Sequence, residues 1–260
     1  MELLAPSRWK RIDFISDIHL DEGDPATFSG WKNYLQSTTA DALFILGDLF
    51  EVWVGDDVLG AGSAFQTECV SVLRQAAQRL DLHIMCGNRD FLMGAALMQA
   101  CQATALADPS VLTFAGHRIL LTHGDALCTA DTDYQAFRQT VRSASWQADF
   151  LSKPLAERQA IARSIRSQSE SRKQTGAPYA DVDPVAASAL LAEADASVML
   201  HGHTHQPGDH ALADGRRRLV LSDWCLGTEP PRADRLQLCA AGVLTFLRMN
   251  IASTSHSMPP

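Results

Sequence analysis

The first half of the chain alternates short apolar runs with longer amphipathic stretches. The apolar runs predict buried strands, at Arg11–Ser16, Ala42–Leu46 and Leu82–Cys86. The amphipathic stretches predict helices, at Thr27–Ser37, Ser63–Leu80 and Phe91–Cys101. Strands that alternate with helices in this way form a mainly parallel sheet with the helices packed outside it.

In the second half of the chain, strand patterns follow one another more directly. Two runs, Val111–Phe114 and Arg118–Thr122, flank Ala115-Gly116-His117 and predict a hairpin. A single later run, Ser197–Leu200, predicts another strand. Three runs near the end are expected to pair antiparallel, at Leu219–Ser222, Arg235–Cys239 and Val243–Arg248. We therefore expect one α/β (α+β) domain over residues 1–250, followed by a Ser- and Pro-rich, disordered tail at 251–260.

The stretch 134–176 differs from the rest of the chain, because it shows helical patterns and no strand signal. It carries eight basic and three acidic side chains, so its net charge is +5 and that of the remaining residues is −13. Large apolar residues, such as Trp146 and Phe150, lie among these charges. Such a segment suits a lid over an anionic and apolar ligand. Taken alone, it favours an ordinary pair of helices with solvated arginines.

Composition narrows the classes of function. The 260 residues are 46% hydrophobic with a formal net charge of −8. The negative net charge disfavours general nucleic-acid binding, which needs clustered Lys and Arg to neutralise phosphates. No apolar run approaches the roughly 20 residues of a membrane-spanning helix.

The location and the cysteines form a further pair of expectations. No apolar signal core precedes Ile12, so a cytoplasmic protein is expected. The six cysteines form no Cys-x-x-Cys pair and are expected to be reduced thiols.

Five polar motifs each follow a predicted strand, which is where ligands bind in open α/β sheets. They are Asp17-Ile18-His19, Gly47-Asp48, Gly87-Asn88-Arg89-Asp90, His123-Gly124-Asp125 and His201-Gly202-His203-Thr204-His205. The first four are weak signals alone, whereas three histidines within five residues are hard to explain by packing. Together the motifs supply seven candidate metal ligands, Asp17, His19, Asp48, Asn88, His123, His203 and His205. This mixture of imidazole, carboxylate and amide groups fits Mn²⁺, Fe or Zn better than Mg²⁺.

The series of motifs resembles the calcineurin-like metallophosphoesterase superfamily. The resemblance implies a β-sandwich flanked by helices, in αββα layers. It also implies a two-metal site, for which we expect two Mn²⁺ per chain. By the resemblance, one metal takes Asp17, His19, Asp48 and His205. The other takes Asp48, Asn88, His123 and His203, so that Asp48 bridges the two. Two such cations can share a hydroxide and hold the phosphoryl oxygens of an in-line displacement.

Longer blocks narrow the resemblance to one branch, the UDP-2,3-diacylglucosamine pyrophosphatases of lipid A biosynthesis. The blocks span residues 47–57, 87–92, 123–129 and 134–138. The resemblance implies hydrolysis of UDP-2,3-diacylglucosamine to 2,3-diacylglucosamine 1-phosphate (lipid X) and UMP, with 134–176 as a helical lid over the lipid. It implies catalytic roles for Asp48, Asn88, Arg89 and His123. It implies substrate contacts at Asn88, Arg89, Asp131, Ser169, Lys173 and His203. One further basic lid contact of the family falls at Gly176, for which Arg172 is a candidate replacement.

Arg89 stands where many members of the superfamily carry a histidine. Arginine stays charged and is a poor general acid. That suits a diphosphate, because its phosphate-monoester leaving group, with a second pKa near 6, needs little protonation. A phosphoprotein phosphatase is therefore disfavoured. A general phosphodiesterase or nucleotide pyrophosphatase, and a non-catalytic metal-stabilised scaffold, remain alternatives.

The expected partners are the lipid substrate and its product. An anionic membrane surface is a further, reversible partner, and nucleic acid is not expected to bind. The protein is expected to be a monomer on the cytoplasmic face of the inner membrane, held peripherally by the basic and apolar lid.

Overall fold

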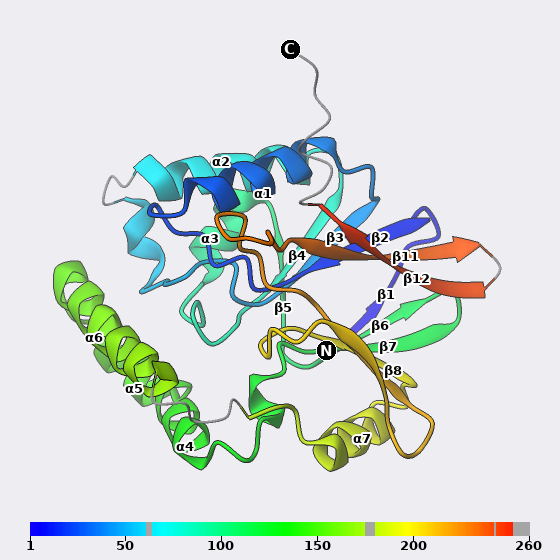
Figure 1. The fold of residues 1–260 in the computed structure, drawn as a ribbon. Helices are drawn as coiled ribbons and strands as arrows, with labels where there is room; N and C mark the ends of the chain where they lie inside the picture. Colours follow the sequence, from blue (N-terminus) through cyan, green and yellow to red (C-terminus); the bar gives the residue numbers. More distant parts are fainter. Residues whose placement is uncertain (61–63, 175–179, 242, 252–260) are drawn as a thin grey trace.

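Two sheets packed face to face form the centre of the computed structural model, with helices on both outer faces (Figure 1). The structure describes residues 1–60, 64–174, 180–241 and 243–251, with the backbone alone at 168–174, 240–241 and 243–244. One apolar cluster fills the space between the sheets, and two others fill the spaces between each sheet and its helices. The expected αββα sandwich is confirmed.

The first sheet has the strand order β12-β11-β2-β3-β4-β5. Four of its strands run parallel, β2 (Arg11–Ile15), β3 (Ala42–Leu46), β4 (Asp81–Met85) and β5 (Thr104–Leu106). Two antiparallel strands extend one edge, β11 (Asp234–Ala241) and β12 (Val243–Asn250). Phe14 and Phe44 belong to the cluster between the sheets, whereas Ile15 and Ile45 belong to the cluster under the helices. Since both faces of β3 are buried, this strand is apolar throughout, whereas β2 also carries the exposed Arg11 and the buried Asp13.

The second sheet has the strand order β1-β6-β7-β8-β10-β9. Its strands are β1 (Glu2–Leu4), β6 (Ser110–Phe114), β7 (His117–Leu121), β8 (Val198–His201), β9 (Gly208–Ala211) and β10 (Arg217–Val220). The expected antiparallel pairing of Leu219–Ser222 with the last two strands is wrong. β10 runs parallel to β8, with Leu219 opposite Leu200. This happens because β9 and β10 form a hairpin and Leu219 packs between the sheets, so the chain crosses to the first sheet only after Val220.

Helices α1 (Pro25–Ser37), α2 (Ala64–Ala77) and α3 (Ala95–Cys101) cover the first sheet, and α7 (Pro184–Glu193) covers the second (Figure 1). Two 3₁₀ helices, η1 (Asp56–Leu59) and η2 (Asp125–Leu127), lie in loops. The helix predicted to start at Phe91 begins instead at Ala95, because Gly94 is its N-cap. The Asp56 carboxylate accepts hydrogen bonds from the backbone nitrogens of Gly94 (2.9 Å) and Leu97 (3.0 Å) and so caps this helix from another loop.

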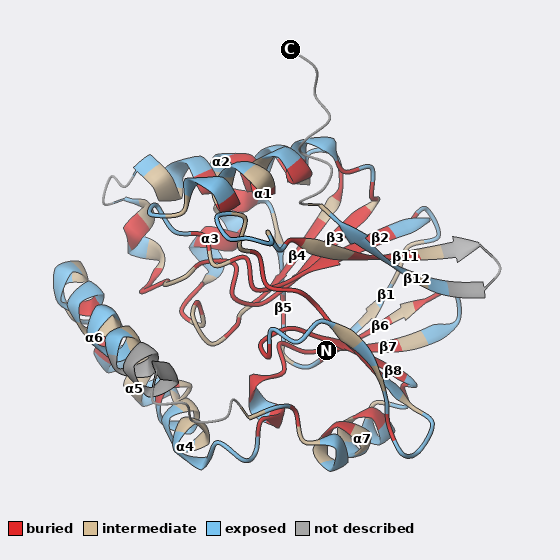
Figure 2. Cartoon of the chain, viewed as in Figure 1, coloured by how far each residue is buried: buried red, intermediate tan, exposed pale blue. Residues whose placement is uncertain are grey.

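Three helices occupy the stretch predicted to be helical, α4 (Thr132–Val141), α5 (Ala144–Leu151) and α6 (Leu155–Gln174). We call them the cap. They stand beside the sandwich, and much of their surface is exposed (Figure 2). On the inner side, the rings of Trp146 and Phe150 stack at 4.7 Å between centroids and join the cluster under α1–α3. No helix in the described part of the chain is both long and apolar enough to cross a bilayer.

Two further expectations concern the thiols and the tail. All six cysteines are free thiols, as the sequence predicted. The tail expected to be disordered lies outside the described residues, apart from Ile251. Gly176, the proposed end of the lid, also lies outside them.

Candidate metal centre

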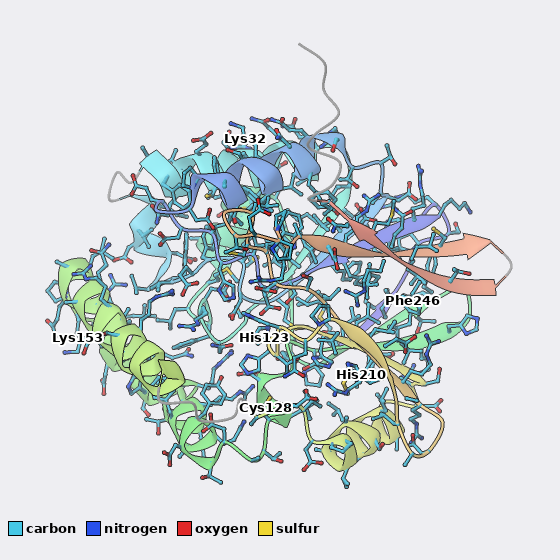
Figure 3. The ribbon with its side chains drawn as sticks, in the orientation of Figure 1. Lys32, His123, Cys128, Lys153, His210 and Phe246 are labelled. Carbon is cyan, nitrogen blue, oxygen red and sulfur yellow. The ribbon has the colours of Figure 1, made fainter. Side chains whose placement is uncertain are left out.

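The five polar motifs meet at one edge of the sandwich, in loops that follow β2, β3, β4, β7 and β8. The backbone nitrogen of Asp17 donates to the carbonyl of Gly47 (3.1 Å), and that of His19 donates to the carbonyl of Asp48 (3.0 Å). From the other sheet, the backbone nitrogen of His203 donates to both carboxylate oxygens of Asp17, at 3.1 and 2.9 Å. These bonds fix the loops of both sheets to one another. Figure 3 shows side chains, including His123, filling the region between the sheets and the cap.

Two glycines allow these loops to approach closely. A Cβ atom on Gly87 would lie 2.1 Å from Asp48 Oδ1, and one on Gly202 would lie 1.9 Å from Ser16 Oγ. Both contacts are impossible for real atoms, so any side chain at either position would push a ligand-bearing loop away. Glycine is therefore required in both motifs for a steric reason.

The backbone at most of the candidate ligands is left-handed. Five of them have positive φ angles near 50–65°, namely Asp17 (52°), His19 (52°), Asp48 (51°), His203 (66°) and His205 (52°). Such angles are uncommon for residues with a side chain, although Asp and His adopt them more often than most. Sparsely populated backbone conformations of this kind concentrate at functional sites.

The first group of ligand atoms comprises Asp17, His19 and His205, with Asp48 beside them. His19 Nε2 lies 3.4 Å from His205 Nε2 and 4.0 Å from Asp17 Oδ1. His205 Nε2 lies 3.4 Å from Asp17 Oδ1, and Asp48 Oδ2 lies 4.0 Å from His19 Nε2. The four atoms therefore point into one small volume.

The second group shares Asp48 with the first. His123 Nε2 lies 3.7 Å from Asp48 Oδ2 and 2.9 Å from Asn88 Oδ1. His203 Nδ1 lies 2.8 Å from the same Asn88 oxygen. Asp48 Oδ2 thus lies within 4.0 Å of a ligand nitrogen in each group, which is the position that a bridging carboxylate needs.

These distances fit divalent cations. Nitrogen and oxygen ligands lie about 2.0–2.2 Å from Zn²⁺, so neighbouring ligands around one such ion lie roughly 3.0–3.5 Å apart. The ligand pairs in each group are 2.8–4.0 Å apart, so small side-chain shifts would close either shell. The donor set combines carboxylate, imidazole and amide, which suits Mn²⁺, Fe or Zn.

The electrostatics of the site also favour cations. Burial lowers the pKa of His123, but the carboxylates of Asp48, Asp17 and Asp125 outweigh it and raise this pKa to about 9. Burial raises the pKa of Asp17, but His205, His123 and His19 outweigh it and hold this pKa below its usual range. The Asp17 carboxylate therefore remains anionic and attracts positive charge to the centre of the site.

Further residues lie beside the candidate ligands, and the sequence did not single them out. Glu51 Oε2 lies 2.9 Å from His19 Nδ1, and Asp223 Oδ2 lies 3.8 Å from His205 Nδ1. His123 Nδ1 donates to the Leu46 carbonyl at 3.0 Å. Carboxylates and carbonyls on the far nitrogen of a metal-binding imidazole fix its ring and tautomer. No spacing in the sequence indicates these contacts, because each joins residues brought together only by the fold.

Asp90, the last residue of the Gly-Asn-Arg-Asp motif, has a structural role. Its carboxylate accepts hydrogen bonds from the backbone nitrogens of Gly87 (2.7 Å) and Leu49 (2.7 Å). It thereby joins the loop that carries Asn88 to the loop that carries Asp48. Burial first, and then the Asp48 charge, raise the pKa of Asp90 to about 7.

The predicted substrate contacts divide into two sets. Asn88 and His203 lie in the second ligand group, and Arg89 lies at its border, with its guanidinium 3.8 Å from Glu51. Asp131 is exposed and caps α4 by accepting from the backbone nitrogen of Tyr134 at 3.0 Å. Ser169, Arg172 and Lys173 lie on α6, and their side chains are outside the described residues.

The positive charge of the cap is used in part to attach it to the sandwich. Arg138 Nε donates to the buried carboxylate of Asp125 (2.8 Å), next to His123. Arg142 Nη2 donates to the carbonyl of Gly87 (2.8 Å), next to Asn88. The net charge of the segment is therefore a poor measure of how much charge it offers to a ligand.

The other two anchoring arginines come from α6 and reach the loop that follows Asp48. Arg158, which is 1% exposed, donates to the Val54 carbonyl and pairs with Asp57. Arg166 forms an ion pair with Glu51. Cap arginines thus contact three of the ligand-bearing loops, those that carry Asp48, Asn88 and His123.

Tyr134 connects the cap to a ligand. Its hydroxyl donates to Asp125 Oδ2 at 2.5 Å, and its ring stacks on that of His203 at 6.0 Å between centroids. This contact packs the cap directly against the ring of a candidate ligand.

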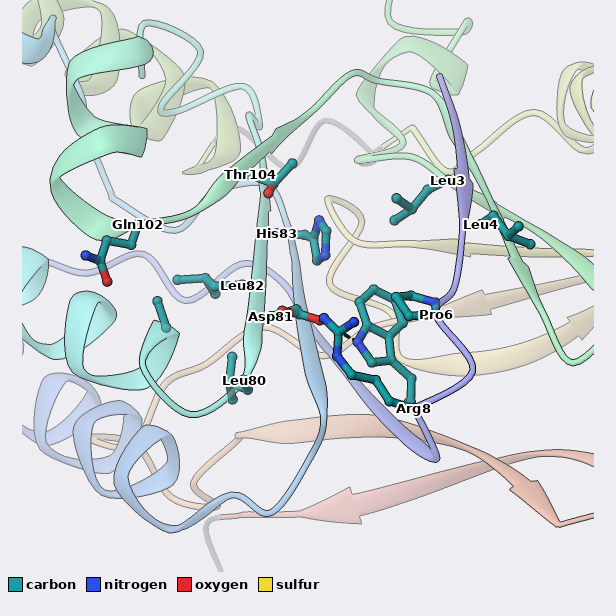
Figure 4. A pocket seen from close by; sticks show the side chains of 12 residues that line it. Leu3, Leu4, Pro6, Arg8, Leu80, Asp81, Leu82, His83, Gln102 and Thr104 are labelled. Carbon is teal, nitrogen blue, oxygen red and sulfur yellow. Dashed lines mark hydrogen bonds and ion pairs between the residues drawn. The ribbon is translucent and has the colours of Figure 1, made fainter.

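A cavity of about 250 Å³ lies elsewhere, at the amino end of β4, and none of the candidate ligands lines it (Figure 4). His83 is buried in its wall, with its ring stacked on Phe44 at 4.5 Å and edge-on to Trp9 at 5.6 Å. Within the described residues, neither ring nitrogen of His83 has a hydrogen-bond partner. Burial, opposed by Asp81, lowers the pKa of His83 to about 4, so the ring is neutral at neutral pH.

Residues 10–207 match the profile of the calcineurin-like phosphoesterase family, and all seven candidate ligands lie within the matched range. The chain belongs to this family.

Within the family, the chain falls among relatives that bear the name UDP-2,3-diacylglucosamine hydrolase. It is 42% identical over 238 residues to the protein of that name from Bordetella pertussis, across 89% of this chain and 92% of the relative. It is 45% identical over 222 residues to that of Chromobacterium violaceum, across 82% and 90%. Among solved structures, zinc-bound Vps29 from Entamoeba histolytica matches 93% of this chain and 99% of that chain, with 14% identity and a TM-score of 0.45.

Proposed function

We propose that the chain is a UDP-2,3-diacylglucosamine diphosphatase, a metal-dependent hydrolase that forms lipid X and UMP. The carrying observation is the convergence of seven candidate ligands in a chain 42–45% identical to relatives of that name. The relatives match along most of their length, so the similarity is not limited to the motifs.

The family binds divalent metal ions, and this chain supplies two sets of ligands for them. Asp17, His19, Asp48 and His205 would hold one cation. Asp48, Asn88, His123 and His203 would hold a second. Mn²⁺ is the proposed ion in both positions, with Fe or Zn as alternatives. When bound, such cations polarise phosphoryl oxygens and lower the pKa of the attacking water.

Arg89 provides positive charge for the diphosphate from the edge of the second ligand group. Its backbone nitrogen donates to Asp48 Oδ1 at 2.8 Å, which fixes the residue beside the bridging carboxylate. A guanidinium stabilises charge without exchanging a proton, so the phosphate-monoester leaving group departs unprotonated. The proposed attack is at the uridylyl-side phosphorus.

The cap provides an apolar surface for acyl chains. Its exposed large apolar side chains include Phe137, Leu151 and Ile165. Asp131, Ser169 and Lys173 are the proposed polar contacts along the same segment. We further propose that the cap lets a monomeric protein dock reversibly on the anionic cytoplasmic face of the inner membrane, where its substrate resides.

Hydrolysis in ¹⁸O-labelled water tests the activity and the site of attack together. With Mn²⁺ and UDP-2,3-diacylglucosamine, the purified protein should release lipid X and UMP, with the label in UMP. Label in lipid X would show that water attacks the other phosphorus, on the glucosamine side. Rapid cleavage of bis-p-nitrophenyl phosphate without cleavage of the lipid would favour a general phosphodiesterase. If neither compound is cleaved, the result would favour the alternative of a non-catalytic, metal-stabilised scaffold.

A further inference from the structure

Glu51 joins the candidate metal centre to the cap. One of its carboxylate oxygens, Oε2, lies 2.9 Å from His19 Nδ1. The other, Oε1, forms the ion pair with Arg166 of α6 and lies 3.8 Å from Arg89 Nη1. The Glu51 side chain is only 13% exposed, so its charge is largely shielded from water. One carboxylate therefore contacts a candidate ligand, the proposed diphosphate contact and the cap.

A metal-binding imidazole needs a fixed acceptor on its second nitrogen. His19 faces the ligand group through Nε2, so Nδ1 faces Glu51 at 2.9 Å, a close contact whose angle is not that of a hydrogen bond. A carboxylate in this position orients the ring and increases its basicity, which strengthens metal binding. A largely buried carboxylate is unfavourable unless it is paired with a positive group. Arg166 and Arg89 both bring positive charge to Glu51 Oε1, and Arg166 belongs to α6, so the placement of Glu51 beside His19 is linked to the docking of α6.

We propose that Glu51 is a positioning residue that orients His19 for a divalent cation and couples cation binding to the docking of α6 through Arg166. This inference rests on the proposed metal site and extends it, because Glu51 is neither a candidate ligand nor a predicted substrate contact. Coupling of this kind is reciprocal, so a bound cation stabilises the docked cap as much as the docked cap strengthens cation binding.

Direct titration with Mn²⁺ tests the first half of the proposal. Free Mn²⁺ is measured by electron paramagnetic resonance, which needs no substrate. Glu51→Gln keeps the side-chain shape but loses the charge, and it should weaken binding about tenfold. Glu22→Gln is the matched control, because Glu22 is exposed, close in sequence to His19 and equally charged. It should change affinity less than about twofold. Wild-type affinity in Glu51→Gln would overturn the proposal.

Hydrogen exchange of the α6 backbone tests the second half. Glu51→Gln and Arg166→Gln should each speed exchange over residues 156–167, and the double variant should exchange no faster than the faster single variant. Arg163→Gln removes the same charge from an exposed position on the same helix and should exchange like wild type. Saturating Mn²⁺ should slow exchange in wild type and not in Arg166→Gln. Additive effects, or no response to Mn²⁺ in wild type, would overturn the coupling.

These results separate the inference from the proposed function. If wild type binds Mn²⁺ and Glu51→Gln binds it equally well, only the role of Glu51 fails. If wild type binds no Mn²⁺, both fail. If both halves of the test succeed but the lipid is not cleaved, the proposed substrate is wrong while the role of Glu51 stands.

Discussion

The buried guanidinium of Arg158, on α6, donates a hydrogen bond to the carbonyl of Val54, six residues after the candidate bridging ligand Asp48. The same guanidinium donates to the Lys153 carbonyl (3.0 Å) and pairs with Asp57. One side chain thus attaches the cap to the loop that leaves the metal centre.

Arg158→Met should destabilise the protein by about 1–3 kcal/mol, because it leaves the Val54 carbonyl without its donor. Urea unfolding measures the change. Lys153→Met is the control, since Lys153 makes an exposed ion pair with Glu157 within the cap and should alter stability by under about 0.5 kcal/mol. Equal stability of both variants would mean that the Arg158 contacts do not hold the cap.

Removal of metal should abolish turnover. Exhaustive dialysis against a chelator should inactivate the protein, and Mn²⁺ should restore activity. Asp48→Asn preserves the side-chain volume and tolerates the left-handed backbone, yet it should lower turnover about a hundredfold or more. Circular dichroism should show an unchanged fold. Full activity in excess chelator would contradict the two-metal proposal.

Arg89→Lys should fail to restore the activity lost in Arg89→Ala, because lysine lacks the two-pronged geometry that binds a phosphate through parallel hydrogen bonds. The comparison uses kcat/KM for the lipid diphosphate. Arg89→His should shift the ratio of activities towards an aryl phosphodiester, since imidazole can protonate an aryloxide. Wild-type turnover in the lysine variant would show that a point charge suffices.

His83 should make stability depend on pH. Its pKa is about 4 in the folded protein, below the usual value near 6.5 in an unfolded chain. As pH falls below 6.5, the unfolded state takes up the proton first, so folding becomes less favourable, by about 2–3 kcal/mol at pH 4.5. His83→Phe should reduce the difference in unfolding free energy between pH 7.5 and 4.5 by that amount. His117→Phe, at an exposed position, should leave it unchanged.

Binding to anionic vesicles should weaken as salt increases, because the attraction between basic side chains and lipid charge is screened. Sedimentation with phosphatidylglycerol vesicles at about 50 and 500 mM salt measures the change, with neutral vesicles as the control. Salt-independent binding would assign docking to apolar contacts alone. Absence of binding at low salt would contradict membrane docking.

The convergence of the candidate ligands was predictable in part, because each of them follows a predicted strand. The predicted strands that end at Leu46 and Cys86 pair in parallel, so their carboxyl ends lie together and the residues after them converge. The histidines after β8 belong to the other sheet, and only their density marked them as functional. Local pattern thus indicated which candidate ligands would lie together, although it could not give their distances.

Features that depend on distant partners were not predictable. β10 was assigned to the wrong sheet, because strand direction and pairing depend on the hairpin with β9, a four-residue edge strand with half-exposed side chains. β1 and β5 have only three residues each, too short for a pattern of alternation. Arg158 looks like any solvated arginine in sequence, since its partner Val54 lies 104 residues away.

The left-handed backbone at five candidate ligands has a consequence for the history of such proteins. At each of these positions the side chain needed for chemistry is one that the backbone accommodates poorly, and glycine would suit the backbone better. In the proposed reaction, Asp or His at these positions supplies the metal ligands. A descendant that abandoned catalysis would be released from this conflict, and replacement of His205 by glycine or asparagine would relieve its left-handed backbone without removing the backbone hydrogen bonds that Asp17 and Asp48 accept. In such a descendant, the loss of activity would be visible as substitutions at the candidate ligands while the fold was still unchanged.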